Sequence, residues 1–414
     1  MSNHQIVILA AGSSSRFYPF NTVNKSLFVV CGRPIIAYTL ESVKTAGFHE
    51  AIVVTGPDQK DRDTITSFTP KGLAITYTIL EKPAGQGAAL LAARAHIKGN
   101  FFLINSQQLK FHEQIKPHLN KFDRADFFGA VLRMHTDSPE KYGIFHLEGD
   151  RVLELIEKPS KDQAPSNWKL VGTYFFTPEF LEILSNTPAQ EYSLEAAINT
   201  VIAQGKFQAF ESTIDYPSLK YPWDLFDVKD HIFSTLKPSI SKSAKIAATA
   251  IIRGQVTIED GALIGDFAIV EGPAYLGKNA VVGTYSQVRA GSVLEAGAQA
   301  ERYCDVRGSL IGPNTHIHSQ LVADSILGSN IRIGGGFVSA SKRIDRQNVQ
   351  VLVKGRLVDT GRNNIGVFVG NDTHIGVNAS VMPGTVIGPH SILYPGITLK
   401  GTHEADKKIT NSNL

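Results

Sequence analysis

Apolar residues recur at every sixth position at the start of the second half of the chain. A helix repeats every 3.6 residues and a strand every 2.0, so neither explains a strict period of six. A parallel β-helix does, because each short strand of a coil turns one aliphatic side chain inward. We therefore expect a solenoid of hexapeptide repeats. The residues that set the period are Ile240, Ile246, Ile252, Ile258, Ile264, Val270, Leu276, Val282 and Val288.

The same period predicts where the solenoid ends and where it is interrupted. It loosens after Val288, returns at 311–333 and is lost over 341–364, which is rich in charged residues. It is present again over 369–393. We expect a β-helix domain over residues 240–401 with an excursion loop at 341–364. The polar residues 402–414 predict a flexible tail.

The first part of the chain has a different pattern, in which short apolar runs alternate with helical patterns. Residues 5–9, 50–55, 74–80 and 101–105 read as strands, with helical patterns such as 34–46 between them. This order predicts βαβ units and a mostly parallel, Rossmann-like sheet covered by helices. We assign this α/β domain to residues 1–236.

Composition narrows the class of protein. A chain of 414 residues exceeds what one core usually supports, so two domains agree with its length. Its net charge of +3 is small and its basic residues are spread out, which argues against nucleic acid as a partner. Cys31 and Cys304 suggest neither a disulfide framework nor a thiolate zinc site. Without a run that predicts a membrane span or a signal peptide, we expect no membrane partner and a cytoplasmic location.

The densest chemical signal is the loop Ile8–Arg16, which follows the first predicted strand. Its small residues allow backbone N–H groups to approach phosphate oxygens, and Arg16 and Lys25 can supply positive charge. Open α/β sheets bind ligands at the carboxyl ends of their parallel strands. The loop matches neither G-x-x-x-x-G-K-S/T nor G-x-G-x-x-G.

The sequence from Leu9 to Ile35 resembles the signature of sugar-1-phosphate nucleotidylyltransferases, L-A-A-G-x-G-T-R-x-x-P followed by P-K-x-L-x-x-V-x-G-x-P. Ser14, Ser15 and Asn24 depart from it, at its second glycine, its threonine and a proline. The resemblance implies a nucleotide-binding segment at Leu9, Ala10, Ala11, Gly12, Ser13 and Ser14. The matching residues are Leu9, Ala10, Ala11, Gly12, Arg16, Pro19, Lys25, Leu27, Val30, Gly32 and Pro34.

Further pieces follow in the order that this family has. Glu81 with Gly85 and Gln86 resembles its base-recognition segment, with glutamate for glutamine and glutamine for threonine. The segments around Gly143, Glu157-Lys158 and Gly172-Thr173-Tyr174 resemble its sugar-phosphate contacts and a later strand. The resemblance therefore implies sugar-phosphate-binding roles for Gly143, Glu157, Lys158, Gly172 and Tyr174.

The activity implied by the resemblance joins a hexose 1-phosphate to a nucleoside triphosphate, UTP or dTTP, with release of pyrophosphate. The sugar is N-acetylglucosamine or glucose. Positioning and charge neutralisation carry such a reaction. Arg16 is then expected on the leaving phosphates and Lys25 on the α-phosphate and the attacking oxygen. Lys158 is expected on the sugar phosphate and Glu157 on sugar hydroxyls.

One position departs from the family where magnesium is bound. After the strand 101–105 the family reads G-D, and its aspartate holds Mg²⁺, but this chain has Ser106-Gln107. A neutral amide is a poorer ligand for a hard divalent cation, so we expect a weaker or differently built metal site. Asp215 and Asp224 are both candidates for the second family aspartate, and the spacing does not decide between them. Asp224 also fits a helix N-terminal charge.

The hexapeptide half resembles left-handed β-helices that pack as trimers, so we expect a homotrimer. A nucleotidylyltransferase domain followed by such a solenoid is similar to the bifunctional enzymes that acetylate glucosamine 1-phosphate and uridylylate the product. Their acetyltransferase motif, H-x-x-Y-x-G-D, matches at His318 and Asp324, with Leu321 and Ala323 as departures. The resemblance implies that His318 is the general base, which takes a proton from the sugar amine as its nitrogen attacks the thioester of acetyl-CoA. An ordinary surface histidine explains it equally well.

Three hypotheses remain open. The first is an active nucleotidylyltransferase whose solenoid is a trimer scaffold and a second, acetyltransferase site. The second is a degenerate relative that binds a sugar nucleotide for regulation, which Gln107 favours. The third is an acetyltransferase alone. Retention of Arg16, Lys25, Glu157 and Lys158 favours the first.

Overall fold

The computed structural model describes residues 4–12, 14–122, 126–215 and 217–411. These residues form two compact units. The first takes residues 4–12 and 34–215, and the second takes 14–33 and 217–411. Segment 14–33 and residues 217–236 thus group with the solenoid, whereas the sequence pattern assigns residues 1–236 to the first domain.

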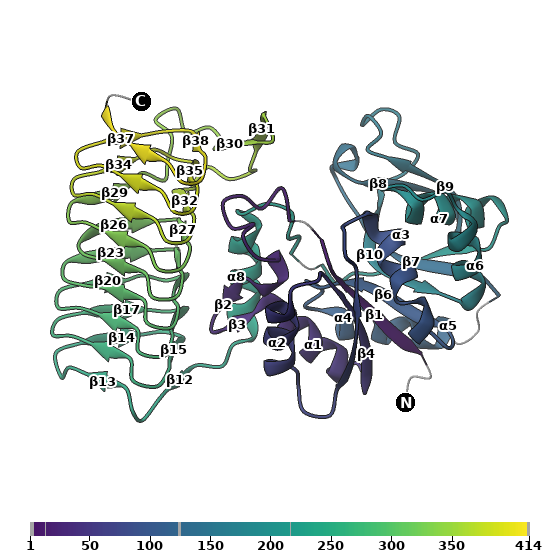
Figure 1. The fold of residues 1–414 in the computed structure, drawn as a ribbon, viewed down its shortest axis with the longest axis horizontal. Helices are drawn as coiled ribbons and strands as arrows, with labels where there is room; N and C mark the ends of the chain where they lie inside the picture. Colours follow the sequence, from purple (N-terminus) through teal and green to yellow (C-terminus); the bar gives the residue numbers. More distant parts are fainter. Residues whose placement is uncertain (1–3, 13, 123–125, 216, 412–414) are drawn as a thin grey trace. The chain divides into compact units, whose positions relative to one another are not determined.

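The first unit is built on one nine-stranded mixed sheet of order β5-β4-β1-β6-β10-β7-β11-β9-β8 (Figure 1). β1, β4, β5 and β6 are parallel, and β10 is antiparallel to β6 and β7. The predicted Rossmann-like sheet is confirmed. Its strands are β1 (Gln5–Ala10), β4 (Glu50–Thr55), β5 (Ala74–Ile79), β6 (Phe101–Asn105), β7 (Gly129–His135), β8 (Gly143–Glu148), β9 (Arg151–Glu157), β10 (Trp168–Phe176) and β11 (Phe207–Glu211).

Helices cover both faces of this sheet because its central strands are apolar on both sides. On β6, Phe101 and Leu103 join the cluster beneath α3, α6 and α7, whereas Phe102 packs against Phe111 of α4 at 5.6 Å between ring centroids. The helices are α1 (Ile35–Thr45), α2 (Gln59–Ser67), α3 (Gly85–Ala92), η2 (Arg94–His96), α4 (Phe111–Ile115), η3 (Lys116–His118), α5 (Leu119–Phe122), η4 (Pro139–Lys141), α6 (Pro178–Asn186) and α7 (Ser193–Ala203).

The second unit contains the predicted left-handed parallel β-helix, whose three parallel sheets form its walls (Figure 1, green to yellow). One sheet is β12 (Ser239–Ile240), β15 (Val256–Ile258), β18 (Ala274–Leu276), β21 (Ser292–Leu294), β24 (Leu310–Ile311), β27 (Ile326–Leu327), β32 (Val367–Val369), β35 (Thr385–Ile387) and β38 (Thr402–His403). The next is β13 (Lys245–Ile246), β16 (Leu263–Ile264), β19 (Val281–Val282), β22 (Gln299–Ala300), β25 (His316–Ile317), β28 (Arg332–Ile333), β33 (His374–Ile375), β36 (Ile392–Leu393) and β39 (Lys408–Ile409). The third is β14 (Ile251–Arg253), β17 (Ile269–Glu271), β20 (Gln287–Val288), β23 (Cys304–Arg307), β26 (Gln320–Ala323), β29 (Phe337–Ser339), β34 (Ser380–Val381) and β37 (Thr398–Leu399).

The apolar residues of the six-residue period form the solenoid core from Ile258 onward, where each is almost completely buried. Ile240 and Ile246 are 53% and 37% exposed, because the first coil has a neighbouring coil on one side only. Where the period loosened, the coils are shorter. Ile264 pairs with Val282, eighteen residues on, but Cys304 pairs with Gln320, sixteen residues on.

The solenoid departs from the prediction at its end. Residues 402–411 are not a flexible tail: β38 pairs with β35 and β39 with β36, and Ile409 is buried in the core. The polar composition of this segment concealed the one apolar residue that β39 turns into the core, Ile409. The predicted excursion 341–364 contains an antiparallel hairpin, β30 (Gln350–Val353) and β31 (Arg356–Asp359).

Two further pieces of the second unit lie outside the coils. The first holds η1 (Lys25–Leu27) and a hairpin of β2 (Val29–Val30) and β3 (Arg33–Pro34), and the second is helix α8 (Asp224–Thr235). The rings of Phe17, Phe20 and Phe28 pack edge to face within segment 14–33. Among the described residues, none of the helices has the length and apolar character that spanning a membrane requires.

Candidate active site

In the first unit, the predicted nucleotide-binding residues lie at the carboxyl edge of the parallel strands. Leu9 and Ala10 end β1, and Leu9 is in register with Asn105 at the end of β6. Gly12 is exposed, whereas Ser13 lies outside the described residues. From the neighbouring helix α3, the Gln86 Nε2 lies 3.5 Å from the Asn105 Oδ1. Backbone and amide groups of β1, β6 and α3 therefore lie at this edge.

Glycine is required where α3 begins. Gly85 has a φ of +88°, and a Cβ there would lie 2.1 Å from the carbonyl oxygen of Glu191. The chain can therefore turn into α3 close to a neighbouring backbone only with glycine at this position. Glu81 precedes this turn and is exposed.

The predicted sugar-phosphate residues lie on β8, β9 and β10. Gly143 is in register with Glu157, and a Cβ on Gly143 would lie 3.1 Å from the Glu157 Oε2. Lys158 has a φ of 49°, and its Nζ lies 3.6 Å from the Glu157 Oε1. Both side chains are exposed, so they are available to a ligand from solvent.

β10 holds the two remaining predicted residues of this group in different surroundings. Gly172 lies where the register of β10 with β7 shifts, between Val171 and Tyr174. Tyr174 is buried in the core and stacks on Phe176 at 5.7 Å. A packing role therefore accounts for Tyr174.

In the second unit, the predicted catalytic residues Arg16 and Lys25 interact with each other and with Asp224. The Lys25 ammonium interacts with the charges of Arg16 and Asp224, and its Nζ donates to the Leu219 carbonyl oxygen at 2.7 Å. The backbone N–H of Lys25 donates to the Ser14 Oγ at 3.0 Å. Arg16 is exposed. Residues that lie about 200 positions apart in the sequence are thus neighbours.

Burial and neighbouring charges shift the pKa values of Lys25 and Asp224. Burial, and then the Arg16 guanidinium, lower the pKa of Lys25 to about 8, opposed by Asp224. Burial raises the pKa of Asp224 to about 6, opposed by hydrogen bonds from the backbone N–H groups of Tyr221 and Lys220 and by Lys25. A lysine whose pKa is brought this close to physiological pH, and which is still mostly an ammonium there, is typical of a functional site.

The donor set does not fit a magnesium site built by protein carboxylates. Position 107 is neutral, and the Asp224 Oδ2 already accepts two backbone N–H groups. Asp215 belongs to the other unit. Within the described ranges, no three histidine, cysteine, aspartate or glutamate side chains are grouped so that they could hold a metal ion. Magnesium prefers several anionic oxygens, which the part of the chain that the structure describes does not gather.

In the β-helix, His318 has a partner that the motif did not indicate. The His318 Nδ1 lies 2.7 Å from the Glu301 Oε2. Because Ala300 pairs with Ile317, Glu301 lies directly beneath His318, one coil earlier. The seventeen-residue length of this coil is therefore the sequence feature that could have identified Glu301 as the partner of His318. Both residues line a hollow of about 550 Å³ together with Arg332, His374 and Tyr394.

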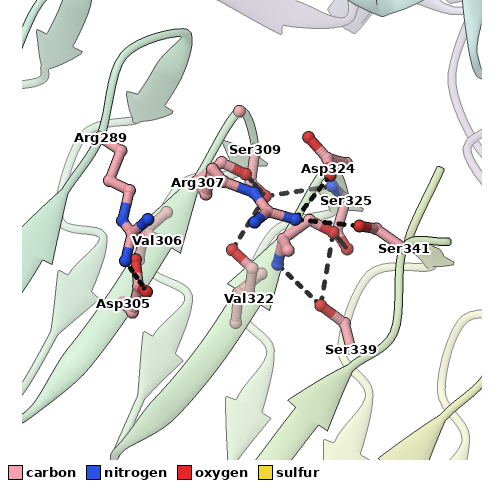
Figure 2. Close-up of polar contacts among 12 residues, drawn as sticks. Arg289, Asp305, Val306, Arg307, Ser309, Val322, Asp324, Ser325, Ser339 and Ser341 are labelled. Carbon is pink, nitrogen blue, oxygen red and sulfur yellow. Dashed lines mark hydrogen bonds and ion pairs between the residues drawn. The ribbon is translucent and has the colours of Figure 1, made fainter. Parts of the chain in front are cut away.

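The other motif residues face a separate cluster. The Asp324 Oδ2 lies 3.0 Å from the Arg307 guanidinium, which also donates to the Ser341 Oγ at 3.0 Å (Figure 2). His318 precedes β26 and Asp324 follows it. The structure therefore places these two motif residues at opposite ends of one strand.

The chain is similar to known nucleotidyl transferases in sequence. The family model described as Nucleotidyl transferase matches residues 5–223. A bifunctional protein GlmU of Methanococcus maripaludis is 34% identical, over 94% of this chain and 92% of the relative. A bifunctional sugar-1-phosphate nucleotidylyltransferase/acetyltransferase of Sulfurisphaera tokodaii is 28% identical, over 94% and 95%. A solved UDP-glucose pyrophosphorylase from Acinetobacter baumanii has a TM-score of 0.47 and 19% identity, over 56% of this chain and 94% of that one.

Proposed function

Since this chain belongs to the nucleotidyl transferase family, we propose that it joins a hexose 1-phosphate to the nucleotidyl group of UTP or dTTP and releases pyrophosphate. N-acetylglucosamine 1-phosphate and glucose 1-phosphate are the proposed acceptors. The grouping of Lys25, Arg16 and Asp224 carries this proposal, because a partly buried ammonium beside a guanidinium is suited to a polyanion.

In the proposed reaction, an oxygen of the sugar phosphate attacks the α-phosphorus and the bond to pyrophosphate breaks. Arg16 neutralises the leaving phosphates. Lys25 donates to the α-phosphate; an ammonium has three N–H groups, and its bond to Leu219 uses one. Lys158 binds the sugar phosphate and Glu157 binds sugar hydroxyls. Leu9, Ala10, Ala11 and Gly12, with Ser13, Ser14, Glu81, Gly85 and Gln86, bind the nucleotide.

Magnesium dependence stays a prediction. The roles proposed for Arg16, Lys25, Glu157 and Lys158 do not require a metal ion. A magnesium ion brought in by the triphosphate would depend on the nucleotide's own oxygens, because Gln107 offers no charge.

The direct test is pyrophosphate release by the purified full chain. The assay supplies UTP or dTTP in turn with glucose 1-phosphate or N-acetylglucosamine 1-phosphate, and magnesium. We expect release that depends on both substrates. Nucleotide binding without release in all four combinations would favour the degenerate sugar-nucleotide-binding protein instead.

We propose acetyl transfer from acetyl-CoA to glucosamine 1-phosphate as a second activity, which the His318–Glu301 pair supports. A carboxylate on one ring nitrogen orients the imidazole and leaves the other to accept a proton from the amine. We expect His318→Ala to lower the rate of thiol release about 10²-fold or more, and Glu301→Gln about tenfold. His390→Ala, on another exposed histidine of the β-helix, is the matched control. An unchanged rate in His318→Ala would exclude this site.

We also propose that the chain assembles as a homotrimer through its β-helix. Phe267, Tyr285 and Tyr303 are each at least half exposed and stack in a row at 5.1 and 5.5 Å, which is unusual for a surface that only water covers. We expect light scattering to give three times the mass of one chain. Tyr285→Asp should lower that mass, and Leu357→Asp, at another exposed apolar residue, should not. A monomer in the wild type would refute the proposal.

A further inference from the structure

The β-helix contacts segment 14–33 at two separate places. The backbone N–H of Gly32 donates to the Glu295 Oε2 at 2.9 Å, and the Tyr18 hydroxyl donates to the His403 carbonyl oxygen at 2.7 Å. Glu295 follows β21 and His403 ends β38, with β24, β27, β32 and β35 between them in one sheet. At about 4.8 Å per strand, these two anchors lie roughly 24 Å apart along the solenoid.

The first anchor is built specifically for a tight turn. Cys31 and Gly32 have φ values of 52° and 76° between β2 and β3, as a two-residue type I′ hairpin turn requires. A Cβ on Gly32 would lie 2.2 Å from the Tyr275 Oη. Glu295 itself is fully buried. A buried carboxyl group is costly unless it is hydrogen-bonded, so the turn and Glu295 form one unit.

The second anchor depends on a glycine of the solenoid, Gly388. A Cβ on Gly388 would lie 2.0 Å from the Tyr18 Oη, so glycine there admits the phenol to the coil backbone. Burial, and then the carboxylates of Glu404 and Asp406, raise the pKa of Tyr18 to about 12. The phenol therefore stays a proton donor to His403.

The residues between and beside these anchors carry the proposed phosphate chemistry. Arg16 lies two residues before Tyr18, and Lys25 lies between Tyr18 and Gly32. The carbonyl partner of Lys25, Leu219, precedes α8, which is also fixed to the solenoid. The Lys229 Nζ of α8 is buried and donates to the Gly291 and Gly308 carbonyl oxygens at 2.5 and 3.3 Å.

We propose that the β-helix is a positioning element for nucleotidyl transfer, with Glu295 and Tyr18 as the positioning residues that fix the segment carrying Arg16 and Lys25. The inference rests on the proposed roles of those two cations. A displacement of about 1 Å in such groups costs on the order of 10²-fold in rate. The solenoid thus contributes to the chemistry of the first activity and is more than a scaffold for a second one.

The test compares Glu295→Ala, Glu295→Gln and Tyr18→Phe in the full chain. We expect Glu295→Ala to lower the kcat of nucleotidyl transfer about 10- to 100-fold and Tyr18→Phe about 3- to 10-fold. Glu295→Gln keeps an oxygen for the Gly32 N–H and should restore kcat to within about 3-fold of the wild type. Thr315→Ala is the control, because this buried threonine bonds only solenoid backbone in the described contacts.

Hydrogen exchange of the amides in segment 14–33 gives a readout that needs no activity. We expect faster exchange in Glu295→Ala and Tyr18→Phe, and exchange as in the wild type in Thr315→Ala. Unchanged exchange and kcat in Glu295→Ala, or an equal loss of kcat in Thr315→Ala, would overturn the inference. If the wild type transfers no nucleotide, the proposed function fails, and the exchange experiment still decides whether the solenoid holds the segment.

Discussion

Lys25→Met is expected to lower kcat/KM for nucleotidyl transfer about 10²- to 10³-fold, which is about 3–4 kcal/mol of transition-state stabilisation. The Lys25 ammonium is the partly buried cation of the group formed with Arg16 and Asp224. Methionine keeps the length of the side chain and removes its charge. Pyrophosphate release measured over a range of sugar-phosphate concentrations checks the effect.

The pH dependence of kcat/KM shows whether the charge of Lys25, rather than the structure around it, is what the reaction needs. Because the pKa of Lys25 is lowered to about 8, its charge disappears as the pH rises through that value. The kcat/KM of the wild type should therefore fall above about pH 8. The kcat should fall at a higher pH, since a bound triphosphate stabilises the ammonium.

Two variants are the controls for Lys25. Lys25→Arg keeps its charge over this range, so its profile should lose the alkaline decline, although its activity is reduced. Lys60→Met, on the exposed side of α2, should behave as the wild type. A wild-type profile that stays flat to pH 9, or full activity in Lys25→Met, would remove Lys25 from the site.

Periodic patterns allowed most of the fold to be predicted. The six-residue period identified the β-helix because one buried aliphatic residue per strand is the physical requirement of each coil. β4 and β6 were predicted with the bounds that the structure has, since each contains an unbroken apolar run, 51–54 and 101–104. Helices α6 and α7 were not predicted. Both are short amphipathic segments, and their apolar faces are buried only because they pack against the sheet.

The candidate site was harder to predict because its residues are brought together by tertiary structure. The loop signature identified Arg16 and Lys25, but nothing local indicates that their segment is fixed by Glu295, more than 260 residues later. Glu301 was equally hidden, although the coil length pairs it with His318. Side chains that act across coils follow the register of the solenoid and not the sequence motif.

Gln107→Asp is expected to raise nucleotidyl transfer at low magnesium, by about tenfold or more, and to lower the magnesium concentration that gives half the maximal rate. Gln107 stands where the family resemblance places a metal-binding aspartate, in the loop directly after β6. A carboxylate there would add one anionic oxygen to a donor set that lacks them, and hard cations bind such oxygens best. Initial rates across a magnesium titration measure the effect.

Gln107→Asn is the matched control, because asparagine has the size of aspartate and no charge, and it should not change the magnesium dependence. Binding of Mn²⁺ in the presence of nucleotide, followed by electron paramagnetic resonance, gives a second readout that does not need turnover. We expect tighter binding in Gln107→Asp alone. Equal Mn²⁺ affinity and equal rates in all three proteins would mean that position 107 does not face the metal, and that the neutral side chain is not the reason for the incomplete donor set.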